Sequence, residues 1–123
     1  MIKILVVDDE LDVCDFVKSF FTERNFKVLT ALSGEEALRA IRKENPHIVL
    51  LDMKMKGMDG LETLKRIRQI DKNMKVIMVT AVEEHDKMDM ARKLGVSKYI
   101  TKPLVLEELE AAVRENTKGV KDA

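Results

Sequence analysis

Five side chains with charged or hydroxyl ends each stand at, or just beyond, the end of a short apolar run: Asp8, Asp9, Asp52, Thr80 and Lys102. Three carboxylates brought within a few ångströms of one another repel, so either their protonation changes or a cation lies among them. Oxygen ligands with no usable histidine or cysteine nearby select a hard cation such as Mg²⁺, which keeps several waters and accepts a phosphate. These residues therefore predict a site for a divalent cation and a phosphoryl group.

The two residues that are not acids suit the oxygens of a phosphoryl group, since Lys102 supplies a fixed positive charge and Thr80 a hydroxyl donor. With a cation neutralising its neighbours, Asp52 could attack phosphorus and form an aspartyl phosphate. Taken singly, the acids are typical caps of turns, Thr80 is a strand-end hydroxyl and Lys102 a solvated charge. Their joint placement at successive strand ends favours the phosphate site.

Asp52 stands out because of the segment that precedes it. Ile48–Leu51 is a run of aliphatic residues that is too short for a helix and is followed by glycines. Such a run is typical of a parallel strand buried on both faces. The last residue of such a strand emerges at the carboxyl edge of the sheet, where open α/β sheets bind their ligands. Asp52 is therefore predicted to be a nucleophile, a metal ligand or the cap of the next turn.

Apolar runs alternate with helical periodicity along the whole chain. Strands are predicted at residues 4–7, 26–31, 48–52, 74–80 and 96–101. Helices are predicted at residues 11–24, 33–44 and 83–94, and from residues 61 and 106 onward. Each crossover has the length that parallel pairing needs, so we predict a doubly wound, three-layer α/β sandwich. The strand order does not follow from periodicity.

The first predicted helix, residues 11–24, has a broad apolar face. At about 100° per residue, its apolar side chains fall within an arc of roughly 160°: Val13, Cys14, Phe16, Val17, Phe20 and Phe21. Leu11 falls outside that arc and is expected to be exposed, either as a docking contact or as an isolated surface leucine. Further along, Ser33 and Glu36 predict a capping box, and Gly95 predicts a left-handed helix end.

Size and composition indicate a single soluble domain. The 123 residues suffice for one sizeable core without disulfides. Lys plus Arg and Asp plus Glu number 22 each, with no block of like charge, so binding to nucleic acid or to an anionic membrane surface is not expected. The single cysteine, Cys14, is expected in the core, and no apolar run approaches the length of a membrane span. We expect a cytoplasmic protein.

The chain resembles the CheY-like receiver domains of two-component response regulators. The resemblance covers about residues 2–117 and rests on Asp8-Asp9, Asp52 followed by Met55, Met58, Asp59 and Gly60, Thr80-Ala81, Gly95, and Lys102-Pro103. It implies a flavodoxin-like parallel sheet with the strand order 2-1-3-4-5. It also implies a receiver domain over residues 1–117, with a C-terminal tail or the start of a linker at 118–123, and a signalling switch rather than an enzyme.

The resemblance implies roles for the acidic residues. Asp52 is similar to the phosphoacceptor of the family. Asp9 and Asp52 are similar to direct ligands of Mg²⁺, together with the backbone carbonyl of Lys54, and Asp8 is similar to a ligand that acts through water. The implied cofactor is therefore Mg²⁺, with Mn²⁺ as an alternative.

The resemblance also implies how the signal enters and leaves. A histidine kinase or a histidine phosphotransfer protein would donate the phosphoryl group to Asp52, and Thr80 and Lys102 would bind it. Thr80 and then Tyr99 would move inward. The face formed by the fourth helix, the last strand and the last helix would then change its output partner. Lys102 and Pro103 match the family's usual cis peptide.

Two features depart from the family pattern or vary within it. Lys56 stands where the family usually has a proline, so a looser loop is expected after Asp52, although no chemical group is lost. Lys54 and Val82 occupy positions that vary in the family and flank the path of attacking water. We expect these two residues to tune the lifetime of the acyl phosphate.

Three alternative functions compete with this interpretation. A phosphohydrolase acting through an aspartyl phosphate commonly has a second acid two residues after the nucleophile, where this chain has Lys54. A flavin or nucleotide carrier would need a glycine-rich phosphate loop, whereas residues 8–12 would repel a phosphate. A receiver-like structural module would lack part of the site, and nothing essential is missing. The sequence carries no output domain, so a stand-alone regulator and the receiver of a longer transcription factor or enzyme are both expected possibilities.

Overall fold

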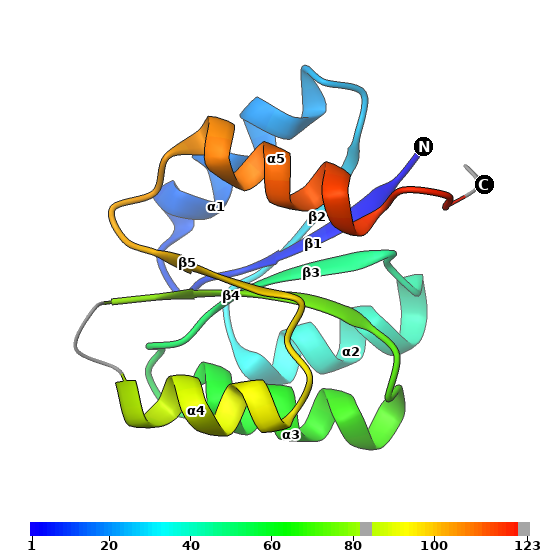
Figure 1. Ribbon diagram of the computed structural model, residues 1–123. Helices are drawn as coiled ribbons and strands as arrows, with labels where there is room; N and C mark the ends of the chain where they lie inside the picture. Colours follow the sequence, from blue (N-terminus) through cyan, green and yellow to red (C-terminus); the bar gives the residue numbers. More distant parts are fainter. Residues whose placement is uncertain (82–84, 121–123) are drawn as a thin grey trace.

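The computed structural model describes residues 1–81 and 85–120, and its centre is a parallel sheet (Figure 1). Within the described residues the five strands are β1 (Lys3–Val7), β2 (Lys27–Ala31), β3 (Ile48–Asp52), β4 (Lys75–Thr80) and β5 (Lys98–Thr101). They are hydrogen-bonded in the order β2-β1-β3-β4-β5, and each neighbouring pair is parallel. The strand order implied by the resemblance is confirmed.

Helices cover both faces of this sheet. They are α1 (Leu11–Thr22), α2 (Gly34–Glu44), α3 (Gly60–Ile70), α4 (His85–Lys93) and α5 (Leu106–Asn116). Helices α1 and α5 lie on one face and α2, α3 and α4 on the other, so the predicted doubly wound sandwich is confirmed (Figure 1). Val82 and the predicted helix start at Glu83 lie outside the described residues.

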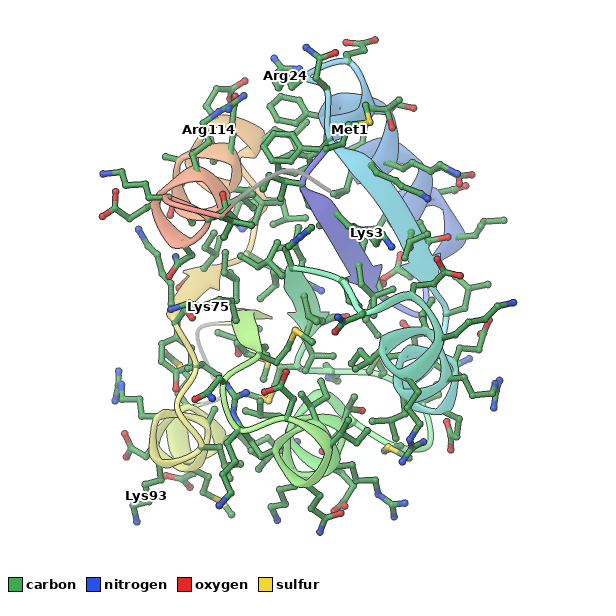
Figure 2. All side chains as sticks on the ribbon, turned by 90° about the vertical axis from the view of Figure 1, so that its right-hand side faces the viewer. Met1, Lys3, Arg24, Lys75, Lys93 and Arg114 are labelled. Atoms are coloured by element: carbon green, nitrogen blue, oxygen red, sulfur yellow. The ribbon has the colours of Figure 1, made fainter. Side chains whose placement is uncertain are left out.

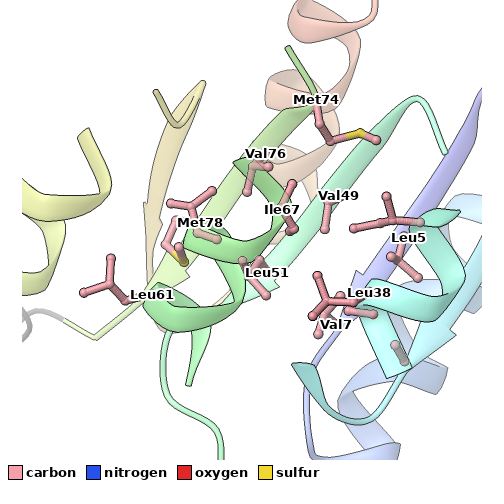
Figure 3. Close-up of a cluster of buried hydrophobic side chains, with 14 of the residues drawn as sticks. Leu5, Val7, Leu38, Val49, Leu51, Leu61, Ile67, Met74, Val76 and Met78 are labelled. Carbon is pink, nitrogen blue, oxygen red and sulfur yellow. The ribbon is translucent and has the colours of Figure 1, made fainter. Parts of the chain in front are cut away.

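The central strands are buried on both faces, as their apolar runs predicted. Because successive side chains of a strand point to opposite faces, β3 contributes Val49 and Leu51 to one apolar cluster and Ile48 and Leu50 to the other. The first cluster lies between the sheet and helices α2 and α3 (Figure 3). The second lies between the sheet and helices α1 and α5. Asp52 therefore ends a strand that is held rigidly from both sides.

The predicted signals at helix ends are present. Ser33 Oγ accepts a hydrogen bond from the Glu36 amide (3.1 Å), while the Glu36 carboxylate accepts one from the Leu32 amide (3.2 Å). In an ordinary capping box the glutamate accepts from the amide of the cap residue itself. Here Glu36 accepts instead from the amide of Leu32, the residue before the cap. Gly95 follows α4 with a φ of 76°, which confirms the left-handed end. Local chemistry therefore sets the start of α2 and the end of α4.

Helix α1 corrects one prediction, because Phe16 is 60% exposed rather than buried. The buried side chains of α1 are Cys14, Val17 and Phe21, whereas Phe16 lies at the edge of the predicted arc, about 100° from Val17. The helix rests on the sheet along the side of this arc that carries Cys14 and Phe21, so Phe16 at the opposite edge reaches solvent. Leu11 is 56% exposed, and Cys14 is in the core, as predicted.

Beyond its C-terminal end, α1 is joined to α5 by aromatic and ionic contacts, near the edge at which the strands begin (Figure 2). The Arg24 guanidinium lies 3.6 Å from the centre of the Phe20 ring, and the Arg114 guanidinium lies 5.0 Å from that of Phe26. Glu110 accepts hydrogen bonds from Arg24 (3.2 Å) and Arg114 (2.9 Å). These contacts hold α5 in place, and with it the loop between β5 and α5, which contains Lys102.

Arg68 fastens the end of α4 to the end of α3. Its guanidinium donates hydrogen bonds of 2.6–3.3 Å to backbone carbonyls, which belong to Asp71, Met74, Leu94 and Gly95. Helix ends leave carbonyls without an intrahelical partner, and one arginine here satisfies such groups after both helices. Burial lowers the pKa of the guanidinium, but an arginine stays charged in proteins. Arg68 therefore sets the position of the C-terminal end of α4.

Replacing Arg68 by alanine is expected to lower the free energy of unfolding by about 2–3 kcal/mol, because several backbone carbonyls lose a charged donor at once. Arg66→Ala on the same helix is the matched control, since Arg66 makes an exposed pair with Glu62 that contributes less than about 0.5 kcal/mol. Denaturant unfolding followed by circular dichroism measures both losses. Equal losses in the two variants would contradict the role assigned to Arg68.

Candidate functional site

Asp8 and Asp52 are buried at the carboxyl edge of the sheet although both are acids. Because β1 and β3 are parallel neighbours, the residues at their ends lie side by side, with exposed fractions of 4% and 3%. The Asp8 amide donates to the Ala31 carbonyl (3.1 Å), and Asp8 Oδ1 accepts from the Glu10 amide (2.9 Å). The fold thus brings two buried carboxylates together at the predicted place.

Lys102 faces Asp52 from the end of β5. Its Nζ lies 3.1 Å from Asp52 Oδ1, and its amide donates to the Thr80 carbonyl (2.8 Å). The Lys102–Pro103 peptide is cis, as the resemblance implied. Among the described residues, Asp52 Oδ1 is a buried acceptor that receives no well-aligned hydrogen bond, and its charged neighbour is the Lys102 ammonium. The carboxylate is positioned and its oxygen is available to another group.

Burial changes the protonation of both acids. Burial, more than the negative charge of Asp52, raises the pKa of Asp8 from its ordinary 3.8 to about 6, while the hydrogen bond from the Glu10 amide opposes the shift. Burial also raises the pKa of Asp52, although the Lys102 ammonium and the Lys54 amide lower it. A bound cation would reverse both shifts, because it favours the ionised forms.

Two further carboxylates lie at this edge beside Asp8. Ligand oxygens of Asp8, Asp9 and Glu10 all lie within 4.8 Å of one another, and the Lys56 amide donates to Asp9 Oδ2 (2.9 Å). Together with the unsatisfied Asp52 Oδ1, this set of oxygens fits a hard divalent cation. Glu10 is not among the residues predicted from the sequence. Its position directly after the two aspartates is the signal that could have identified it.

The predicted switch residues make contacts of their own. Thr80 is buried, and its hydroxyl donates to the carbonyl of Ala81 (3.2 Å). Tyr99 is half-buried; its hydroxyl donates to the Met88 carbonyl in α4, and the Arg92 guanidinium lies 5.1 Å from the centre of its ring. Tyr99 therefore links β5 to α4, two of the elements of the predicted output face.

The model of the family described as "Response regulator receiver domain" matches residues 4–114. The chain belongs to this family. The receiver domain is 39% identical over 113 residues to the sporulation initiation phosphotransferase F of Bacillus subtilis, which covers 92% of this chain and 91% of that protein. It is 35% identical over 112 residues to the alkaline phosphatase synthesis transcriptional regulatory protein PhoP of the same organism, covering 91% of this chain and 47% of PhoP. The chain thus spans about half the length of that second relative.

Solved structures agree with this assignment. A response regulator receiver domain protein from Clostridium thermocellum matches with a TM-score of 0.89 and 32% identity, over 94% of each chain. The response regulator TrrA from Thermotoga maritima, in complex with Mg²⁺ and BeF, matches with a TM-score of 0.84 and 34% identity, over 94% of this chain and 99% of that one. The predicted flavodoxin-like fold is confirmed.

Membership of the family establishes the class of function. Receiver domains of two-component response regulators are phosphorylation-controlled signalling switches, and they are generally not classed as enzymes. They typically bind Mg²⁺ in an acidic pocket and interact with histidine kinases or phosphotransfer proteins and with output domains. Among the described residues of this receiver domain, no helix combines the length and the apolar character that a membrane crossing requires.

Asp8→Asn is expected to stabilise the cation-free receiver domain at about pH 8, because a neutral amide replaces a buried carboxylate and can still accept from the Glu10 amide. The pKa of Asp8 is about 6 in the folded state against an ordinary 3.8. The carboxyl group of wild type therefore contributes its full stability only below about pH 4, where it is protonated. That stability is lost as the pH rises through about 6. At about 1.4 kcal/mol per pKa unit, the variant should gain about 2–3 kcal/mol at high pH.

Denaturant unfolding of both proteins in the presence of a chelator, across the range from about pH 4 to about pH 8, measures this gain. The difference in unfolding free energy between Asp8→Asn and wild type should shrink as the pH falls through about 6. A difference that does not change with pH would contradict the buried-carboxylate explanation.

Proposed function

We propose that Asp52 is the phosphoacceptor of this receiver domain and that a histidine kinase or a histidine phosphotransfer protein is the donor. The observation that carries the proposal is the buried Asp52 carboxylate, whose Oδ1 lies 3.1 Å from Lys102 Nζ and has no hydrogen bond among the described residues. A structural acid buried to this degree would ordinarily be hydrogen-bonded. A buried oxygen beside a lysine is instead suited to attack phosphorus and to have the product's charge neutralised.

Mg²⁺, or Mn²⁺ in its place, would be held by Asp9, Asp52 and the backbone carbonyl of Lys54, and by Asp8 through water. The oxygens gathered beside Asp8 and the raised pKa values of Asp8 and Asp52 support this set, since a positive neighbour would stabilise the ionised carboxylates. When bound, the cation supplies positive charge to the carboxylates and to the phosphoryl oxygens. Glu10 adds a further oxygen at the rim of the site.

In the transfer, an oxygen of the ionised Asp52 carboxylate forms a bond to phosphorus as the bond between phosphorus and the donor's imidazole nitrogen breaks. The electron pair of the broken bond stays with the imidazole. The Lys102 ammonium binds one oxygen of the transferred group, and the Thr80 hydroxyl binds another after it leaves the Ala81 carbonyl. The chain's own contribution is therefore positioning and charge stabilisation.

The signal leaves through Thr80 and Tyr99 in this proposal. When the Thr80 hydroxyl turns toward the phosphoryl group, Tyr99 leaves the Met88 carbonyl and moves inward, which alters the face formed by α4, β5 and α5. Met90 on α4 and Lys98 at the start of β5 are exposed and belong to this face, where an output protein or output domain would bind. To go from mostly off to mostly on, the phosphoryl group must favour the active state by about 5 kcal/mol.

Hydrolysis of the acyl phosphate returns the receiver to its starting state, and we propose that Lys54, which is exposed in the loop after β3, tunes its rate. Val82, which the sequence assigns the same role, lies outside the described residues. The receiver domain would comprise residues 1–117, with residues 118–123 as a tail or the start of a linker. Direct binding to nucleic acid is not part of the proposal; the output would come from a separate protein or from an attached domain.

Titration with beryllofluoride and Mg²⁺, which mimics a phosphorylated aspartate, tests the proposal in wild type and in Asp52→Asn. Saturable, Mg²⁺-dependent amide NMR shifts are expected in wild type at Asp52, Thr80 and Lys102, spreading to Tyr99, and should be absent from the variant. Asp15→Asn, which changes an exposed acid on α1, should respond like wild type. No shift in wild type, or an equal shift in Asp52→Asn, would overturn the assignment of Asp52.

A further inference from the structure

The loop after β3 contacts the acidic residues after β1 through a backbone hydrogen bond. The Lys56 amide donates to Asp9 Oδ2 at 2.9 Å, across 47 residues of sequence. Lys56 is exposed, so burial does not demand a protein partner for its amide, and water could satisfy it equally well. The bond joins the two loops that form the acidic edge.

A residue other than proline at position 56 makes this link available. Proline, which the family usually carries here, has no backbone N–H and could not donate to Asp9. Met55 before the donor is buried, and Gly57 after it has a φ of 73°, so the backbone is constrained on both sides of Lys56. From the sequence, a lysine in place of the family's usual proline predicts a looser loop. In the structure, the same residue adds a hydrogen bond to the site.

We propose that the Lys56 backbone amide is a positioning group for the cation ligand Asp9 and tightens the binding of Mg²⁺, a role that rests on the function proposed above. Holding Oδ2 restricts the side chain of Asp9, and Oδ1 is the oxygen that it would then present to the cation. In this arrangement, ligand oxygens of Asp8, Asp9 and Glu10 already lie within 4.8 Å of one another. Asp9 therefore loses little conformational freedom when the cation binds.

The link also acts on the charge at the edge of the sheet. Adjacent carboxylates repel one another. The amide hydrogen of Lys56 places a partial positive charge beside Asp9 Oδ2, and it adds no side-chain cation that would compete with the metal. This contribution belongs to the backbone, so it is independent of the Lys56 ammonium. Partners that orient a metal-ligating side chain are worth about 10- to 100-fold in metal affinity. Because the Lys56 amide lies in an exposed loop, we expect its effect on Mg²⁺ affinity near the lower end of this range, at about tenfold.

Two substitutions at position 56 isolate the amide, because Lys56→Pro removes the donor whereas Lys56→Ala keeps it and removes the side chain. Calorimetric titration with Mg²⁺ should give about tenfold weaker binding for Lys56→Pro than for Lys56→Ala, with circular dichroism showing both variants folded. Equal affinities of the folded variants would overturn this inference alone. Failure of wild type to bind Mg²⁺ would overturn the proposed cation site, and this inference with it.

A cation-free measurement tests the inference even if Lys56→Pro does not fold. In metal-free wild type, the Lys56 amide proton should exchange with solvent about tenfold more slowly than in Asp9→Ala, which lacks the acceptor. The Gly57 amide, in the same loop, serves as the control and should exchange at the same rate in both proteins. Equal exchange rates of the Lys56 amide in wild type and Asp9→Ala would overturn the inference, whether or not Mg²⁺ binds.

Discussion

Replacing Gly60 by alanine is expected to lower the free energy of unfolding by about 3 kcal/mol or more. Gly60 is the first residue of α3, and its amide donates to the Met53 carbonyl (2.8 Å), which holds the helix start against the end of β3. A methyl group on Gly60 would lie 2.7 Å from Met53 Cα and would overlap the carbonyl oxygen of Asp52. Both obstacles are backbone atoms and cannot swing aside, so β3 or α3 would have to shift.

Denaturant unfolding measures this loss, and Gly57→Asn is the matched control. Gly57 lies in the same loop region with open space around it and a φ of 73°, a conformation that asparagine tolerates, so its loss should stay below about 1 kcal/mol. Because the clash at Gly60 falls on the carbonyl of Asp52, Gly60→Ala should also disturb the site. A Gly60→Ala variant as stable as Gly57→Asn would mean that α3 can move away from β3 at little cost.

The segment Ile48–Asp52 shows why the position of the site is predictable from the sequence. An apolar run bounded by turn residues has few alternatives once it must be buried on both faces, and in a parallel sheet its last residue reaches the carboxyl edge. Asp8, Thr80 and Lys102 are located in the same way. These positions follow from the sequence because strand length and burial are encoded locally.

Contacts that depend on how elements pack are not encoded in this way. Phe16 lies at the edge of the apolar arc of α1, and the part of this arc that is buried depends on the angle at which α1 packs against the sheet. Hydropathy does not contain that angle. Arg68 binds backbone carbonyls, which every residue offers, so no pattern of side chains indicates its partners. The hydrogen bond from the Lys56 amide to Asp9 is hidden for the same reason. The strand order, likewise, follows from the resemblance to receiver domains and not from periodicity.

Lys102→Ala is expected to slow the phosphorylation of Asp52 by a small phosphodonor such as acetyl phosphate by about 10²- to 10³-fold. Lys102 Nζ lies 3.1 Å from Asp52 Oδ1 and lowers the pKa of that carboxylate, so it favours the ionised, nucleophilic form, a contribution that shrinks when a bound cation does the same. The phosphoryl oxygens would also lose a cationic donor in a largely buried site. Phosphorylation rates at saturating Mg²⁺ measure the combined loss.

The two contributions of Lys102 separate with pH. A loss due to the raised pKa of Asp52 would disappear at high pH, whereas a loss of charge stabilisation persists at every pH; we expect most of the deficit to persist at about pH 9. Lys98→Ala, at the exposed start of β5, should stay within about twofold of wild type. Mg²⁺ should bind Lys102→Ala no more weakly than wild type, because a positive charge has left the cation's surroundings. Phosphorylation of Lys102→Ala at the wild-type rate would show that Lys102 does not face the transferred group.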